Sequence, residues 1–266
     1  MVVRALSIGQ YIPTDSPVHG LDPRTKLGVV ALVTVALFSV TRFEAFAVLA
    51  GLLLLAVRLS RLPVRSVLRG IKAVGFILAI TLAAHSLRWG SPPAGVPSAG
   101  SLWLDPAGAM TGVFFAVRIV LLVVTTSMLT LTTSPVALAD GLERLMRPLA
   151  ALGVPVGDVA MMLTVALRFI PTTAYEAEQI MMAQAARGAR FDHGGPIKRA
   201  KSLVPVLVPL FVNLFRRADV LAIAMESRCY TSGRRRTRMN ELVMRTSDWL
   251  VLIASAVLCV GLALVM

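Results

Sequence analysis

Residues 107–133 read AGAMTGVFFAVRIVLLVVTTSMLTLTT, and Arg118 is the one charged residue in the run. About 20 apolar residues in a helix are enough to cross a bilayer, so this run predicts a membrane span. At its start, Gly108-x-x-x-Gly112 favours close approach of a second helix, because glycines one turn apart place no side chain between the two backbones. Arg118 is expected either to face a partner or polar cavity, or to extend its side chain toward the interface.

The composition extends this interpretation to the whole chain. Of its 266 residues, 56% are hydrophobic and 15% are charged, whereas soluble domains carry about 25% charged residues. The net charge is +13, but the basic residues lie between apolar runs and are not interleaved with aromatics. This pattern favours anchoring beside anionic lipid over nucleic acid binding. Two cysteines and three scattered histidines predict no disulfide framework, no metal site and no cofactor.

Four further segments have the apolar character of spans: residues 27–41, 45–57, 74–87 and 249–266. The first two are short and are interrupted by Arg42 and Glu44, which favours two short spans joined by a tight turn. One long helix is the alternative. Lys and Arg concentrate in residues 58–72 and 134–245, whereas residues 88–106 contain few. Because cytoplasmic loops are rich in Lys and Arg, five spans place the N-terminus inside and the C-terminus outside a bacterial inner membrane. Residues 1–26 lack the apolar core of a signal peptide.

The middle of the chain differs, since its helical pattern is amphipathic. Ser134-Pro135 is typical of a helix start. Asp158 is expected to cap a long helix that ends at Arg187-Gly188, where glycine suits a left-handed stop. A second long helix is predicted from about Pro205 to Arg228. The expected fold is therefore an all-α polytopic membrane protein in three parts: an N-terminal membrane domain of four spans (residues 1–133), a cytoplasmic region of long amphipathic helices (134–245) and a C-terminal transmembrane helix (246–266).

Each long helix ends in an arginine between small residues. The first tripeptide is Ala186-Arg187-Gly188, and the second is Ser227-Arg228-Cys229. Small neighbours let a helix tip enter a groove, where the planar guanidinium can bind a carboxylate through two hydrogen bonds. Two such tips favour a pair of soluble partners. Ordinary lipid-anchoring arginines are the alternative.

Three motifs in this order resemble the transmembrane (T) component of energy-coupling factor transporters, relatives of the cobalt and biotin importer subunits. They are Leu21-Asp22-Pro23-Arg24-Thr25-Lys26-Leu27, then Gln184-Ala185-Ala186-Arg187-Gly188, and finally the stretch from Val208-Pro209-Leu210-Phe211 through Arg216-Arg217-Ala218-Asp219 to Ala224-Met225-Glu226-Ser227-Arg228-Cys229-Tyr230. The likeness covers essentially the whole chain. One departure is that Ser and Cys flank Arg228, where the family commonly has Ala and Gly.

The resemblance implies a scaffold subunit that does not hydrolyse ATP. Two ABC-type ATPases would bind at Arg187 and Arg228, and the two coupling helices would transmit their motion to a substrate-binding membrane subunit, the S component, for vitamin or metal-ion uptake. The absence of a Gly-x-x-x-x-Gly-Lys-Ser/Thr run is consistent with a non-enzyme. The other motif residues are candidates for structural or coupling roles: Asp22, Pro23, Arg24, Lys26, Arg216, Arg217, Asp219 and Glu226.

Two alternative functions have weaker support. A conventional ABC importer permease would bind one ATPase through one loop, and Tyr175-Glu176-Ala177-Glu178 is only faintly similar to that loop. A secondary carrier or intramembrane enzyme needs acids or histidines within its spans, and Glu44 beside a predicted turn is the only acid found there. Glu176 and Glu178 are expected to be solvated, or else to pair with Arg168 or with the basic linker.

Overall fold

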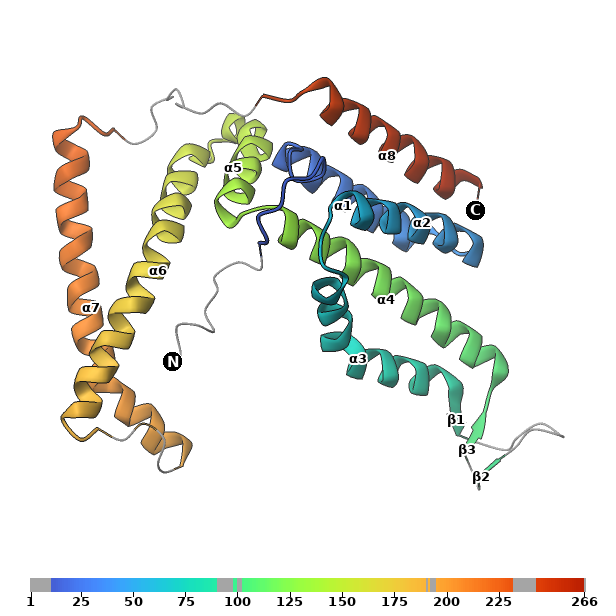
Figure 1. Ribbon diagram of the computed structural model, residues 1–266, viewed down its shortest axis with the longest axis horizontal. Helices are drawn as coiled ribbons and strands as arrows, with labels where there is room; N and C mark the ends of the chain where they lie inside the picture. The colour runs from blue at the N-terminus through green and yellow to red at the C-terminus, as the bar shows by residue number, and fades with distance from the viewer. Residues whose placement is uncertain are drawn as a thin grey trace. The chain divides into compact units, whose positions relative to one another are not determined.

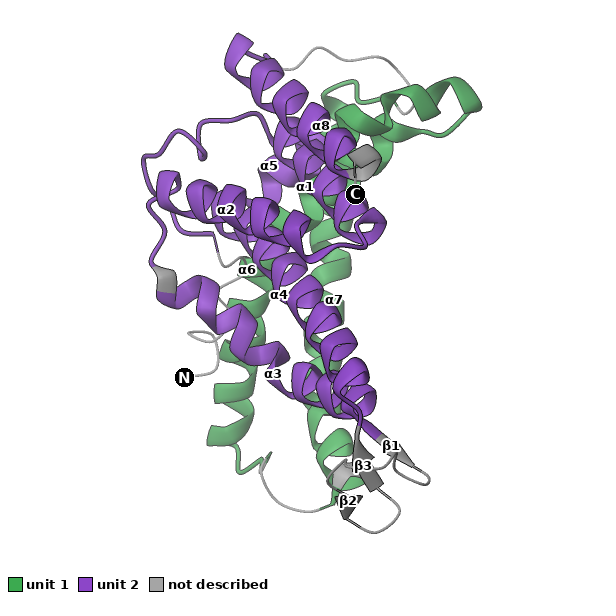
Figure 2. Ribbon diagram, turned by 90° about the vertical axis from the view of Figure 1, so that its right-hand side faces the viewer, with its two compact units in different colours: residues 1–9, 142–240 green, residues 10–141, 241–266 purple. Residues whose placement is uncertain are grey.

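The computed structural model describes residues 11–89, 98–99, 102–189, 191, 195–231 and 243–265. The chain divides into two compact units, coloured separately in Figure 2: unit 2 (residues 10–141 and 241–266) and unit 1 (residues 1–9 and 142–240). The boundary falls within a helix, so the two units are described separately below.

Unit 2 contains five long helices and the first part of a sixth, shorter one (Figure 1). They are α1 (Pro23–Ser39), α2 (Phe43–Leu59), α3 (Val64–Ser86), α4 (Pro106–Thr132) and α8 (Thr246–Val265), and α5 (Pro135–Met146) reaches the boundary. A small antiparallel sheet joins α3 to α4 in the order β1-β3-β2, with β1 at Leu87–Trp89, β2 at Ser98–Ala99 and β3 at Leu102–Leu104. Apart from this sheet, the loop at residues 11–22 and the short connections between helices, the described part of the unit is helical, as the sequence predicted.

The first apolar region forms two helices rather than one. α1 ends at Ser39 and α2 begins at Phe43, so the break falls at Arg42 as expected. The basic segment 58–72 was expected to be a loop, but α2 runs to Leu59 and α3 begins at Val64. Arg65, Arg69 and Lys72 therefore lie on α3, because no proline or glycine signal between Val64 and Arg69 stops the helix.

The core of unit 2 lies between α1, α2, α4 and α8. α1 and α8 pack closely enough that a Cβ at Gly28 would lie 3.2 Å from Leu252. The buried side chains of this core are Val33, Ala36, Leu37, Val40, Ala45, Phe46, Leu49, Leu53, Leu121 and Cys259. Arg118 points into the same region. One guanidinium nitrogen donates to the carbonyl of Val40, the C-terminal cap of α1, at 2.7 Å.

Four phenylalanine rings surround the Arg118 guanidinium at 5.0–5.8 Å: Phe38, Phe46, Phe114 and Phe115. The cation thus satisfies a helix-terminal carbonyl and is stabilised by the ring faces. Neither of the roles expected from the sequence, a partner-facing charge or an extension toward the interface, matches this internal contact.

Unit 1 consists mainly of two long helices, α6 (Val156–Ala186) and α7 (Pro196–Ser227), preceded by a 3₁₀ turn, η2 (Arg147–Leu152). Two details differ from the sequence prediction. Pro155 precedes α6 as its N-cap, so Asp158 lies within the first turn instead of capping it. α7 begins at Pro196, not near Pro205, and both Pro205 and Pro209 lie inside it.

Among the described residues, three helices are long and apolar enough to cross a membrane: residues 65–86 of α3, all of α4, and α6. Residues 246–262 of α8 form a shorter apolar helix. α6 was expected in a cytoplasmic region, and its length and composition are also sufficient for a span. Several apolar helices of this length are typical of a multi-pass membrane protein.

Candidate functional site

The end of α6 is closed by a regular set of backbone hydrogen bonds. Arg187 is the C-cap, and Gly188 follows with a φ of +89°. The Gly188 N–H donates to the Ala185 carbonyl at 2.9 Å, and the Ala189 N–H donates to the Gln184 carbonyl at 3.0 Å. This pair of bonds is the Schellman arrangement. The prediction of a left-handed glycine at this position is confirmed.

The end of α7 has the same arrangement. Arg228 is the C-cap, and Cys229 occupies the left-handed position with a φ of +57°. The Cys229 N–H donates to the Glu226 carbonyl at 2.9 Å, and the Tyr230 N–H donates to the Met225 carbonyl at 2.9 Å. The two arginines therefore have equivalent positions, although different residue types follow them.

Both arginine side chains are exposed. Within the described part of the chain, neither Arg187 nor Arg228 forms an ion pair with an Asp or Glu. An exposed guanidinium at a helix C-terminus is also favourably placed beside the partial negative charge of the last carbonyls. Each helix end is thus a rigid, positively charged tip that can receive a carboxylate from outside the chain.

α6 and α7 run in opposite directions (Figure 1), and the following three polar contacts between described residues link them. Near the middle, Arg217 donates to Glu176 in an ion pair, and its guanidinium lies 5.5 Å from the Phe169 ring. Toward one end, the Tyr230 hydroxyl donates to Asp158 at 3.4 Å. Neither Arg168 nor the linker is the partner of Glu176, contrary to the alternatives weighed from the sequence.

The third link explains how α7 tolerates an internal proline. Pro209 has no N–H, so the carbonyl of Pro205, four residues earlier, lacks its helical donor. The Gln184 side chain of α6 donates to this carbonyl at 3.5 Å. The neighbouring helix thus supplies a substitute for the bond missing at Pro209.

In unit 2, the first motif forms a buried junction where three helix ends meet. The Asp22 carboxylate caps α1 by accepting from the Arg24 N–H at 2.9 Å. Asp248, which is 1% exposed, accepts from the Asp22 N–H at 2.9 Å and from the Arg245 N–H at 2.8 Å. One aspartate therefore satisfies the N–H of the residue just before α8 and holds the start of α1.

Lys26, in the first turn of α1, completes this junction. Its ammonium group donates to the carbonyls of His19 at 3.1 Å and Thr132 at 3.0 Å. Burial lowers the pKa of Lys26 to about 8, although the carboxylates of Asp248 and Asp22 oppose this shift. Pro23 is buried beside it and contacts Gly141 of α5, where an added Cβ would lie 3.0 Å from the proline ring.

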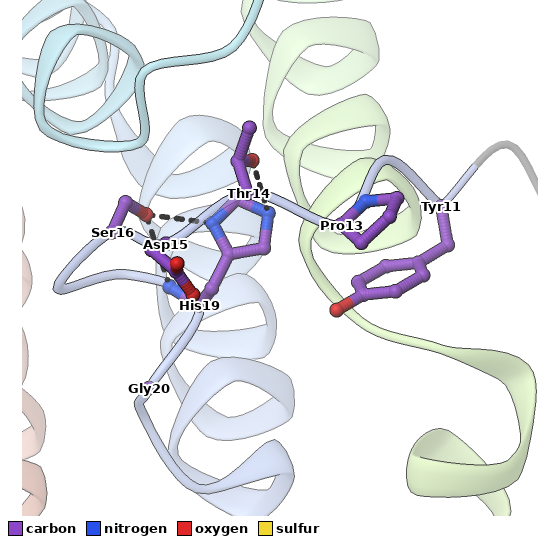
Figure 3. Close-up of a pocket in the computed structure, with 7 residues that line it drawn as sticks. All are labelled: Tyr11, Pro13, Thr14, Asp15, Ser16, His19 and Gly20. Atoms are coloured by element: carbon purple, nitrogen blue, oxygen red, sulfur yellow. Dashed lines mark hydrogen bonds between the residues drawn. The ribbon is translucent and has the colours of Figure 1, made fainter.

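The loop before α1 folds around His19 (Figure 3). The hydroxyls of Ser16 and Thr14 lie 2.6 Å and 3.1 Å from the two ring nitrogens. Burial and the nearby charge of Lys26 lower the pKa of His19, while backbone hydrogen bonds and Asp15 act in the opposite direction. A shallow hollow beside this ring is lined by Tyr11, Pro13, Thr14, Asp15, Ser16, His19 and Gly20. The polar groups of Thr14, Ser16 and His19 bind one another or the backbone of the loop, which supports a structural role for the loop.

The remaining candidates do not form one cluster. Arg216, Asp219 and Glu226 are exposed along α7. Sequence reasoning missed Asp248, and it considered Glu176 without identifying its partner Arg217. An acid in the first turn of a helix was the available signal for Asp248, but no local pattern indicates that it reaches Asp22.

The chain also matches a known protein family over most of its length. The family model described as cobalt transport protein, CbiQ, matches residues 14–239. Similar proteins are named energy-coupling factor transporter transmembrane protein EcfT. The relative from Heliobacterium modesticaldum is 46% identical over 254 residues, covering 95% of this chain and 94% of its own.

Two further relatives carry the same name. The protein from Thermosediminibacter oceani is 44% identical over 259 residues, which is 97% of each chain. The protein from Bacillus subtilis is 39% identical over 254 residues, which is 96% of each. The fold and these matches define a multi-pass helical membrane component of a transport system. The chain belongs to the cobalt transport protein family, as the transmembrane component of an energy-coupling factor transporter.

Proposed function

We propose that this chain binds two ABC-type ATPase subunits, one at the tip of α6 and one at the tip of α7. ATP hydrolysis takes place on those subunits, and α6 and α7 act as coupling helices that transmit the resulting motion. The receiver is a separate substrate-binding membrane subunit, the S component, which carries a vitamin or a metal ion into the cell.

The observation that carries the proposal is the equivalence of the two helix ends. Arg187 and Arg228 are both C-caps of a Schellman arrangement, both are exposed, and neither uses its charge on an acid within the described residues. Two equal tips suit two ATPase subunits of the same fold. An exposed ion pair contributes about 0.2–1 kcal/mol, whereas removing one partner of a buried pair costs about 3–5 kcal/mol. We expect an arginine tip that is seated in a groove of an ATPase to contribute a binding free energy between these two values.

The proposal includes an orientation in a bacterial inner membrane. The dense Lys and Arg segments face the cytoplasm together with the N-terminus, the C-terminus lies outside, and anionic lipid surrounds the membrane helices. Residues 134–245 then form the cytoplasmic coupling region, between an N-terminal membrane domain of four spans and the final transmembrane helix at 246–266.

Co-purification tests the docking step. The tagged chain is isolated from its native membrane as wild type and as Arg187→Ala, Arg228→Ala and the double variant, and the bound ATPase subunits are quantified. Each single substitution is expected to weaken ATPase binding at least tenfold, which corresponds to about 1.4 kcal/mol, and the double variant is expected to retain none. Membrane insertion should be unchanged, because both side chains are exposed.

Arg168→Ala is the matched control, since Arg168 is an exposed arginine on α6 away from its tip. It should bind ATPases as the wild type does. Full ATPase recovery with the double variant would contradict the proposal.

A further inference from the structure

The ion pair between α6 and α7 lies at the same distance from each arginine tip. Glu176 precedes Arg187 by eleven residues, and Arg217 precedes Arg228 by eleven residues. At a rise of about 1.5 Å per residue, each interval spans about 16 Å of helix, and eleven residues turn through about three full turns plus 20°. Each tip arginine therefore lies on nearly the same helix face as the pair member on its own helix.

The two intervals are also free of helix breakers. Pro171 lies before Glu176 on α6, and Pro205 and Pro209 lie before Arg217 on α7. Sharp helix bends occur almost always at prolines or similar interruptions. The segments 177–186 and 218–227, here called the two arms, are thus uninterrupted helix. Because α6 and α7 are antiparallel, the arms extend from the ion pair in opposite directions (Figure 1).

The contacts around the ion pair differ in strength. Glu176 and Arg217 form a charge-assisted bond in a partly buried setting, where the two side chains are 24% and 29% exposed. The flanking links are Tyr230–Asp158 at 3.4 Å and Gln184–Pro205 at 3.5 Å, at the outer limit of hydrogen bonding. The pair has an ionised donor as well as an ionised acceptor, and hydrogen bonds weaken as they lengthen. The pair therefore holds the helices more firmly than the two long flanking bonds do.

The geometry of the pair also permits rotation. Glu176 and Arg217 reach their contact through several rotatable side-chain bonds. The pair therefore joins the two helices at one point and does not by itself fix the angle between them.

We propose that Glu176 and Arg217 are positioning residues that form the pivot of the coupling helices, with two arms of equal length. An inward movement of both tips then changes the angle between α6 and α7 about the pair without sliding one helix along the other. This inference rests on the proposed function, because it requires partners that move the tips.

Distances between spin labels test the pivot in the complex that co-purifies with the chain. One label pair replaces the exposed residues Met182 and Ile223, each six residues beyond its pair member. A second pair replaces Thr172 and Val220, each within about one turn of the pivot. The background carries Cys229→Gly and Cys259→Ala, so that the native thiols are not labelled.

The complex is measured without nucleotide and after trapping with ATP and vanadate. The arm-label distance is expected to change by several ångströms, while the pivot-label distance changes by less than one third of that amount. Glu176→Gln should broaden the arm distances and reduce their nucleotide-dependent change at least twofold. The exchanged pair, Glu176→Arg with Arg217→Glu, should restore the change.

The outcomes separate the two proposals. The pivot proposal is wrong, and the docking proposal stands, if the ATPases co-purify but both label-pair distances change equally or not at all. The same conclusion follows if the exchanged pair fails to restore the distance change while circular dichroism shows that the helices are intact. If the ATPases bind the double tip variant as they bind the wild type, the docking proposal itself fails.

Discussion

At the scale of single residues, the two helix ends show that backbone geometry can be conserved within one chain while the residue type changes. Gly188 adopts its positive φ at little cost, but Cys229 has a Cβ in the same left-handed region. That conformation costs a residue with a Cβ roughly 1 kcal/mol relative to glycine. The end of α7 is therefore held in place against a local penalty that the end of α6 does not have.

This difference predicts opposite effects of two substitutions. Cys229→Gly is expected to stabilise the end of α7 by up to about 1 kcal/mol, because it removes the Cβ that makes a positive φ unfavourable. Part of this gain is offset, because glycine increases the conformational entropy of the unfolded chain. Gly188→Ala should destabilise the end of α6 by about 1 kcal/mol. Hydrogen exchange of the Tyr230 and Ala189 amides, which close the two ends, reports each effect. Slower exchange at Ala189 in Gly188→Ala would contradict the explanation.

At the scale of elements, α3 and α4 illustrate a helix pair defined by glycine. A Cβ on Gly108 would lie 2.1 Å from the carbonyl oxygen of His85, and a Cβ on Gly112 would lie 3.1 Å from the His85 Cβ. On the same helix pair, a Cβ on Gly70 would lie 2.8 Å from the Ser127 hydroxyl. The close approach that the Gly108-x-x-x-Gly112 spacing predicted is confirmed, and α3 is the helix that approaches.

Substitutions at Gly108 are therefore expected to separate α3 from α4. Gly108→Ala should destabilise the protein by about 1–3 kcal/mol, because a backbone oxygen cannot move aside as a side chain can. Gly75→Ala is the matched control, since Gly75 lies on α3 with no atom within 4 Å of an added Cβ. Thermal unfolding in detergent micelles measures both, and the control should be neutral or slightly stabilised by the helix propensity of alanine. Equal unfolding temperatures for the two variants would refute the close-approach explanation.

At the scale of the whole molecule, unit 2 is tied together by groups far apart in the sequence. Asp248 binds the backbone at Asp22, and Lys26 binds the last carbonyl of α4 at Thr132. The N-terminus of α1, the C-terminus of α4 and the N-terminus of α8 thus share one buried polar network. Every member of such a network must be satisfied for it to stabilise the fold.

The depressed pKa of Lys26 makes the stability of this unit depend on pH. The folded-state pKa of about 8 lies below the ordinary value of 10.5, so the unfolded chain binds more protons between these two values. Stability should therefore rise as pH increases from about 8 to about 10.5, where the cost of burying the charge disappears. Lys26→Met, which does not titrate, should lack this rise.

The measurement compares the unfolding temperature of the two proteins in detergent across that range. Taking the difference between wild type and Lys26→Met cancels the titration of all other groups. A difference that stays constant, or that falls with pH, would show that Lys26 is not held with a lowered pKa.

The sequence was a good guide wherever a residue acts through its own backbone. Three local features were predicted correctly: the helix stop at Gly188, the helix start at Ser134-Pro135 and the break between helices near Arg42. Each depends on conformational preferences or capping within a few residues. The positions of Arg187 and Arg228 at helix ends follow from the same local rules, and the docking role assigned to them remains a proposal.

The sequence was a poor guide wherever a residue acts through a distant partner. The start of α7 was placed near Pro205, because a proline normally ends or begins a helix. The structure instead has α7 running through Pro205 and Pro209, and the bond that replaces the one missing at Pro209 comes from Gln184 of the neighbouring helix. The sequence did not decide between two roles for Arg118, because the carbonyl that it binds belongs to Val40, 78 residues away in the chain.

By itself, the sequence determined that this is a multi-pass helical protein, where most helices lie and that two of them end in arginine. Only the tertiary structure decided that Glu176 pairs with Arg217, that Asp248 joins α8 to α1 and that Arg118 closes the end of α1. The physical reason is range. Hydrophobic runs, glycines and helix caps act over a few residues, whereas an ion pair or a buried hydrogen bond exists only after packing has brought two distant segments together.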